Sequence, residues 1–125
     1  MNAVDMAKKA YGSNVTAVRT PRSIEYAAFA RITQKLRAAS SDKVESFSAL
    51  ANALHENRRL WTILAVDAAD KDNALPQSLK GQIVYLRQFV NLHSSKILRG
   101  DANADPLIDI NTAMMRGLGQ EARKE

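Results

Sequence analysis

Two histidines and three aspartates are the side chains of this sequence whose types could bind a metal ion. His55 and His93 lie far apart, and no HxxxH or HExxH spacing occurs, so the two would have to meet in the fold to bind a metal. His93 falls among apolar residues at helical spacing, which favours a hydrogen-bonded core histidine. Asp67, Asp70 and Asp72 lack the glycine and glutamate of an EF-hand loop, which favours a solvated helix end.

Catalytic motifs are also missing from the sequence. The chain has no Cys, which excludes a disulfide framework, a thiolate metal site and a Cys nucleophile. No GxGxxG, P-loop or GxSxG motif is present. We therefore expect a binding protein with no enzymatic activity, no metal and no cofactor.

The most unusual segment is Asn57-Arg58-Arg59-Leu60-Trp61, which contains the one Trp of the chain. Arg58 occupies a position in a helical repeat that apolar residues otherwise fill, and an unpaired buried charge is costly. In one interpretation Arg58 reaches the edge of the core or pairs with a carboxylate such as Glu25 or Asp109. In the other, Trp61 anchors a partner protein and Arg58 or Arg59 pairs across the interface. The spacing favours the first interpretation.

A second candidate surface follows Pro106 near the end of the chain. An apolar helix is expected there, with Met114 and Met115 beside four other apolar residues, Leu107, Ile108, Ile110 and Leu118. Such a helix is either part of the core or a detachable flap over an apolar groove, because Met suits adaptable surfaces.

Positive charge is concentrated in the first third of the chain. The chain has 18 Lys and Arg against 13 Asp and Glu, a net charge of +5. Seven of these cations lie in residues 1–41 with only two anions: Lys8, Lys9, Arg19, Arg22, Arg31, Lys35 and Arg37. They could form a nucleic-acid face, but no helix-turn-helix, RNP or zinc module accompanies them. A solvated face is the favoured interpretation, and nucleic acid is not an expected partner.

Composition and length indicate what kind of fold must position these residues. The chain has 125 residues, 46% hydrophobic and 6% aromatic, with five Gly and three Pro. This size fits one domain, and the composition favours an all-α protein over a sandwich or barrel. No apolar run is long enough for a transmembrane helix, and the first residues do not resemble a secretory signal. We therefore expect a cytoplasmic protein.

Helix-start and helix-stop signals divide the chain. A short helix is expected at Val4–Tyr11, with a linker at Val15–Arg19, so that residues 1–19 form an N-terminal helix and linker. Four further helices are expected. They run from Thr20-Pro21 to near Ala39, from Asp42 to before Asp70, from Pro76 to before Gly100, and from Asp105-Pro106 to near Gly117–Gly119. Residues 120–125 are expected to be a frayed tail.

Heptad spacing marks the sides of the two central helices that should pack. The first carries Phe47, Ala51, Leu54, Arg58, Trp61, Ala65 and Ala68, and the second carries Leu79, Ile83, Leu86, Val90, His93 and Ile97. Leu50, Ile63, Leu64 and Val66 add a second apolar face, which predicts that the later half of the first helix is buried nearly all round. The prediction is a small elongated antiparallel bundle of four to five helices, with the first and last helices as short end pieces or flaps.

Three motifs follow one another along the chain: Asn57-Arg58-Arg59-Leu60-Trp61, then Asn73-Ala74-Leu75-Pro76, then Pro106-Leu107-Ile108-Asp109-Ile110-Asn111 followed by Gly117-Leu118. In this order they resemble the FlaF family of flagellar biosynthesis regulators and flagellin chaperones in α-proteobacteria. Their order and spacing match over about residues 20–118, and Glu25 matches an acidic residue of the family pattern.

The resemblance implies a single FlaF-like domain that binds flagellin as a secretion chaperone and works with the FlbT regulator of flagellin translation. The candidate partner-binding residues are those of the first and third motifs, Asn57 to Trp61 and Pro106 to Asn111, with Met114 and Met115. Two alternatives stay open at this point: an RNA-binding protein acting on flagellin mRNA, and an adaptor that binds FlbT alone.

Overall fold

The chain folds as a bundle of four helices, seen in a computed structural model that describes residues 3–4, 22–40, 47–72 and 77–124. Side chains at 22–25, 79 and 117–124 are outside that description. The helices are α2 (Arg22–Ala39), α3 (Phe47–Ala69), α4 (Gln77–Leu98) and α5 (Asp105–Lys124). The described residues contain no strand, which confirms the all-α prediction.

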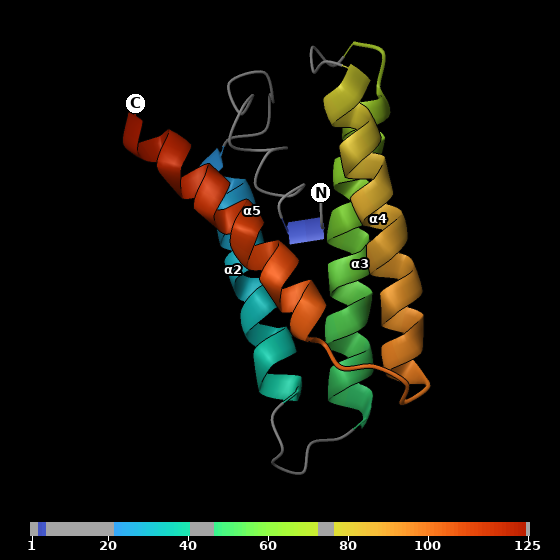
Figure 1. Ribbon diagram of the computed structural model, residues 1–125. Helices are drawn as coiled ribbons and strands as arrows, with labels where there is room; N and C mark the ends of the chain where they lie inside the picture. The colour runs from blue at the N-terminus through green and yellow to red at the C-terminus, as the bar shows by residue number, and fades with distance from the viewer. Residues whose placement is uncertain (1–2, 5–21, 41–46, 73–76, 125) are drawn as a thin grey trace.

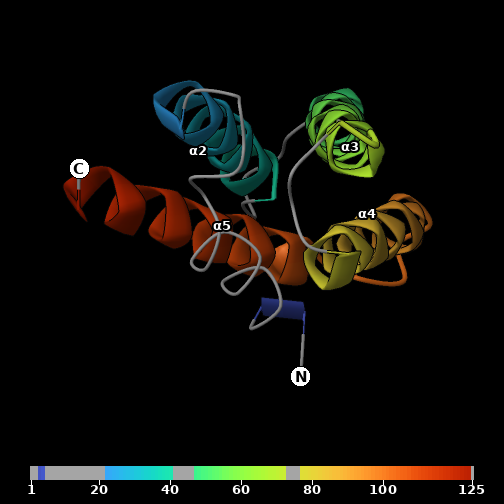
Figure 2. The same cartoon turned by 90° about the horizontal axis from the view of Figure 1, so that it is seen from above.

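Successive helices run in opposite directions, and α5 lies obliquely to the other three (Figure 1). Helix α2 packs against both α3 and α5, and α3 packs against α4. Seen from above, α2 and α3 form one side of the bundle and α5 and α4 the other, with the start of α5 next to α4 (Figure 2). The predicted antiparallel bundle is therefore confirmed.

Helical spacing of apolar residues determines which side of each helix enters the core. Helix α2 buries Phe29, Ile32 and Leu36, which recur every three or four residues. The buried apolar residues of the other helices follow the same pattern: Ala53, Leu54, Trp61, Leu64, Ala65 and Ala68 on α3, Ile83, Leu86, Val90 and Ile97 on α4, and Leu107, Ile110, Ala113 and Met114 on α5. Apart from Ile32, these buried residues and Ala104 make one continuous core between the helices.

The junction between α4 and α5 is built from two local signals that the sequence contains. Gly100 has φ +81°, and its N–H donates to Ile97 O at 3.0 Å while the N–H of Asp101 donates to Lys96 O at 2.9 Å. This pair of bonds is a Schellman motif, which confirms the predicted stop at Gly100. Asn103 Oδ1 then accepts the N–H of Asp105 at 2.9 Å, an Asx turn that leads into α5, and Ala104 O accepts the first helical bond from the N–H of Ile108 at 3.0 Å.

The two glycines at positions 81 and 100 predict opposite effects of the same substitution. A Cβ at either position meets nothing within 4 Å, so backbone conformation decides the outcome. Gly100→Ala should lower the free energy of unfolding by about 1 kcal/mol, because its positive φ disfavours a side chain. Gly81→Ala, inside α4, should raise it by about 0.5–1 kcal/mol. Urea denaturation followed by circular dichroism measures both, and equal signs would contradict the assignment of Gly100 as the helix stop.

Some expectations about α5 and the start of α3 are wrong. Helix α5 continues to Lys124 and packs along α2, so it is neither a short end piece nor finished at 117–119. The residues after Gly119 are Gln, Glu, Ala, Arg and Lys, whose helix propensity offsets the cost of about 1 kcal/mol for each glycine. Phe47, placed on the packed seam, is 63% exposed because it begins α3 at the end of the bundle (Figure 1).

The later half of α3 is also less buried than predicted. Leu64 is buried, but Ile63 and Val66 are 57% and 66% exposed. In the described part of the chain α3 packs against α2 and α4, and the side of the helix opposite the core faces away from both. An apolar sequence on all sides therefore does not produce burial on all sides.

Several predicted boundaries lie outside the described residues. These are the short helix and linker before Arg22 apart from residues 3–4, and the starts at Thr20-Pro21, Asp42 and Pro76. Ala3 and Val4 are half-buried and pack against the core. No helix in the described part of the chain has the length and hydropathy that crossing a bilayer requires.

Candidate partner-binding site

The first and third sequence motifs meet in the middle of the bundle. Trp61 on α3 donates from Nε1 to Asn111 Oδ1 on α5 at 3.0 Å, and Asn111 Nδ2 donates to Asn57 Oδ1 at 2.8 Å. All three side chains are fully buried. These two hydrogen bonds join residues that are 50 and 54 positions apart in the sequence. The two motifs are thus linked by a buried series of hydrogen bonds that holds α5 against α3.

The indole of Trp61 determines how both amides are oriented. An indole N–H only donates, so Asn111 must present its oxygen to Trp61 and its amide nitrogen to Asn57. Asn57 must then accept with Oδ1, and its Nδ2 is left buried with no hydrogen-bond partner. Trp61 also packs edge-on against Phe29 of α2, with ring centroids 5.8 Å apart. One residue therefore connects three helices.

Within the described residues, Arg58 is held by α4 and not by a carboxylate. Its Nη2 donates to the main-chain oxygen of Asn91 at 3.0 Å and to Ser95 Oγ at 2.8 Å, and the side chain is half-buried. The expected partner Asp109 is exposed on α5 and makes no such contact, and the side chain of Glu25 is outside the described residues. The favoured interpretation of Arg58 as a residue at the edge of the core is therefore correct, although its partners are neutral oxygens.

The remaining motif residues divide between the interior and the surface. Leu107, Ile110 and Met114 are buried, and Leu60, Pro106, Ile108 and Met115 are half-buried. Arg59 and Asp109 are exposed. The structure thus brings the two motifs together as bundle framework. In the closed bundle only the exposed and half-buried members are open to a partner, and their role in binding stays a prediction.

The cations proposed for a nucleic-acid face are in part neutralised. Arg31 and Lys35 both bind Glu56 on α3, at 3.2 Å and 2.8 Å, and Arg37 donates to Thr112 Oγ1 on α5 at 3.4 Å. Arg22 is in α2 with its side chain outside the described residues, as are Lys8, Lys9 and Arg19 altogether. For the described cations, binding phosphate would compete with contacts between helices.

Glu56 makes the stability of the α2–α3 contact depend on pH. The hydrogen-bonded Lys35 ammonium, with Arg31, lowers the pKa of the Glu56 carboxyl below its ordinary value, against a smaller opposing effect of burial. A depressed pKa means that the contribution is present above the unfolded-state pKa, about 4.3, and is lost as pH falls through the lower folded pKa.

Glu56→Gln tests this contact. We expect it to lower the free energy of unfolding by about 0.2–1 kcal/mol at pH 7, the range for partly exposed ion pairs. The difference from the parent protein should shrink as the pH falls below about 4.3 and through the lower pKa of folded Glu56. Thermal melts at a series of pH values below 7 measure it, and a difference that stays constant over the whole series would show that the loss is not electrostatic.

His93 and the described aspartates form no metal site. His93 is half-buried; its Nε2 donates to the main-chain oxygen of Asn103 at 2.8 Å, and its ring stacks on Phe89 at a centroid distance of 5.5 Å. It is hydrogen-bonded as expected but lies at the edge of the core. Asp70 Oδ1 accepts the N–H of Asp72 in the turn after α3. Within the described ranges, no three His, Asp or Glu side chains are grouped closely enough to hold a metal ion.

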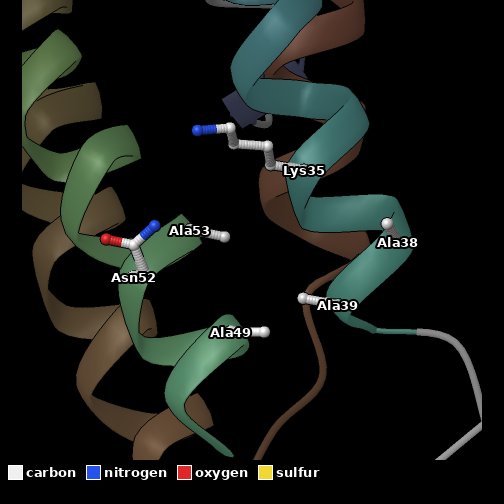
Figure 3. Close-up of a pocket in the computed structure, with 6 residues that line it drawn as sticks. All are labelled: Lys35, Ala38, Ala39, Ala49, Asn52 and Ala53. Carbon is white, nitrogen blue, oxygen red and sulfur yellow. The ribbon is translucent and has the colours of Figure 1, made fainter. Parts of the chain in front are cut away.

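A groove of about 390 Å³ lies between the end of α2 and the start of α3 (Figure 3). Four alanines form most of its wall, together with Lys35 and Asn52, so that its lining residues are Lys35, Ala38, Ala39, Ala49, Asn52 and Ala53. Because Lys35 already binds Glu56, the groove offers little chemistry for a ligand.

Sequence reasoning did not identify the exposed apolar residues. Ile63 and Val66 were expected in the core, and no signal marked Tyr85 or Leu92, which are 49% and 69% exposed. Their positions at i, i+3 and i, i+7 on the helix sides opposite the core could have indicated an outer apolar row.

Comparison with known proteins places the chain in a family. No curated protein and no solved structure matches it. The family model described as flagellar protein FlaF matches residues 7–118, which include both hydrogen-bonded motifs. The chain therefore belongs to the FlaF family of flagellar proteins.

Proposed function

We propose that this protein binds flagellin in the cytoplasm as a secretion chaperone and so supports flagellin synthesis and export. The observation that carries the proposal is membership of the flagellar protein FlaF family over residues 7–118. A contact with the FlbT regulator of flagellin translation belongs to the same proposal, as the family resemblance implies.

The surface of the bundle is compatible with holding another protein's helix. Flagellin ends are amphipathic helices, which self-associate unless their apolar sides are covered. Large apolar side chains lie exposed along α3 and α4, among them Ile63, Val66, Tyr85 and Leu92. Exposed apolar side chains on helices provide the contacts that helix-in-groove recognition uses.

Burial changes which residues carry the proposed contact. Trp61, expected as an apolar anchor, is closed off in the core, so it could contact flagellin only after α5 had left the bundle. We therefore propose that flagellin binds the outer surface of the intact bundle. Within the described residues, Arg31 and Lys35 give the RNA alternative no support, because both are bound to Glu56.

Calorimetric titration of the full chain with monomeric flagellin tests the proposal. We expect saturable binding with a dissociation constant in the micromolar range or tighter, and no binding to flagellin lacking its terminal helices. Absence of binding at tens of micromolar, with titrations at two temperatures because apolar burial can give little heat near 25 °C, would refute the chaperone function. Equal binding to the truncated flagellin would refute recognition of the terminal helices.

A further inference from the structure

Four exposed apolar side chains lie on the outer side of the α3–α4 pair. Ile63 and Val66 on α3 are 57% and 66% exposed, and Tyr85 and Leu92 on α4 are 49% and 69% exposed. We call these four residues the outer apolar face. Soluble monomers rarely leave large apolar side chains grouped at the surface without a binding role.

The outer side follows from which residues the two helices bury. Helix α3 directs Leu54, Trp61 and Ala68 into the core, and α4 directs Leu86 and Val90 into the same core. The four exposed side chains fall on the opposite side of each helix, because a helix repeats every 3.6 residues. Since α3 and α4 pack side by side, their outer sides adjoin (Figure 2).

Arg58 sets the register between the two helices. Its contacts with Asn91 and Ser95 place this part of α3 level with that part of α4. The helices are antiparallel (Figure 1), so the next residues of α3 lie beside earlier residues of α4. Val66, two turns after Arg58, therefore lies near the level of Tyr85, and the two apolar rows run alongside each other.

Positive charge without a partner lies at one end of this face. Lys96 is exposed one turn after Leu92, and Arg59 is exposed one turn before Ile63. Helix α4 contains no Asp or Glu, and within the described residues neither Arg59 nor Lys96 makes an ion pair. The cations of α2 differ in this respect, because Arg31 and Lys35 are already bound to Glu56.

We propose that the outer apolar face binds an amphipathic helix of a partner protein whose carboxylates meet Arg59 and Lys96. Two parallel rows of apolar side chains accept the apolar stripe of one helix between them, and the unpaired cations determine which end of that helix carries its acidic residues. The inference rests on the proposed function, since the partner helix is taken to be one of flagellin.

The apolar part of the proposal is tested by the double substitution Val66→Glu with Leu92→Glu. Binding of monomeric flagellin to the full chain should weaken at least tenfold, because two carboxylates would be buried against an apolar stripe. Phe47→Glu is the matched control: Phe47 is 63% exposed but begins α3 at the end of the bundle, so its substitution should change the affinity less than twofold.

The role of Arg59 in the proposal is tested by comparing Arg59→Glu with Lys71→Glu. The second substitution makes the same change of charge in the turn that follows α3. Arg59→Glu should weaken flagellin binding about five- to tenfold in 50 mM salt, and the loss should shrink at 500 mM salt because screening weakens exposed charge pairs. Lys71→Glu should have little effect. Equal effects of the two variants would overturn the assignment of Arg59.

Three outcomes separate the proposals. If the parent chain binds flagellin and the double variant binds equally well, the outer apolar face is wrong and the chaperone function stands. If the parent chain does not bind flagellin, the function itself fails. If light scattering shows that the parent chain is a dimer and the double variant a monomer, a second copy occupies the face and the proposal is overturned. Circular dichroism melts confirm that the variants are folded.

Discussion

Trp61→Ala should lower the free energy of unfolding by about 3–5 kcal/mol, the range for truncating a large buried aromatic side chain. The change removes a fully buried ring, its edge contact with Phe29 of α2 and its hydrogen bond to Asn111 of α5. Small domains are stable by only about 5–15 kcal/mol, so the loss should shift the urea midpoint strongly. Circular dichroism measures it, because the variant lacks the one Trp needed for fluorescence.

Trp61→Phe is the matched control for this substitution. It keeps an aromatic ring in the core but removes the Nε1 donor, so Asn111 Oδ1 loses its partner and the cost should be about 1–3 kcal/mol. The pair also distinguishes two roles for Trp61. If Trp61→Ala leaves stability unchanged and weakens flagellin binding, Trp61 belongs to an interface and its place in the core is refuted.

Asn111→Ala should lower the free energy of unfolding by about 2–5 kcal/mol. It leaves both the Nε1 donor of Trp61 and the Oδ1 acceptor of Asn57 buried without partners, and each such group costs about 1–3 kcal/mol. Thr112→Ala on the same helix is the control: Thr112 is half-buried, its Oγ1 donates to Ile108 O of the same helix at 2.7 Å and accepts a long hydrogen bond from Arg37 at 3.4 Å, so it takes no part in the Trp61–Asn111–Asn57 contacts. We expect it to change stability by less than about 0.5 kcal/mol.

A double-mutant cycle tests whether the buried polar chain acts as a unit. Once Asn111→Ala has removed the partner of Asn57, Asn57→Ala should cost less than it does in the parent chain, because Asn57 then has no bond left to lose. A coupling energy of about 0.5–3 kcal/mol is expected for residues in direct contact. Additive effects would show that the Asn57–Asn111 hydrogen bond contributes nothing to joining α3 and α5.

Local signals in the sequence predicted much of the fold. The end of α2 near Ala39, the stop at Gly100 and the start of α5 near Asp105 all lie where capping and glycine signals placed them. Helix ends can be predicted from the sequence because capping and glycine signals depend on the conformation of a few neighbouring residues. The end of α5 was missed, since the same glycines that stop helices also occur within them at modest cost.

The candidate site was harder to predict, because a motif marks unusual residues without saying which way they point. Three of the partner-binding residues that the sequence predicts are Asn57, Trp61 and Asn111, whose polar groups bind one another inside the bundle. Ile63 and Val66 looked like core residues and are exposed. Periodicity identifies the apolar sides of a helix, but it does not show on which of those sides another helix packs.

By itself, the sequence of this FlaF-family protein determined its class: an all-helical chain without Cys or catalytic motifs, with apolar stripes that require a bundle. Tertiary structure alone decided that the two family motifs pair with each other through a buried hydrogen-bonded chain, and that α3 and α4 leave one apolar side uncovered. The physical reason is distance. Helical periodicity acts over a few residues, whereas the partner of Trp61 lies 50 residues away and is chosen only when the helices pack.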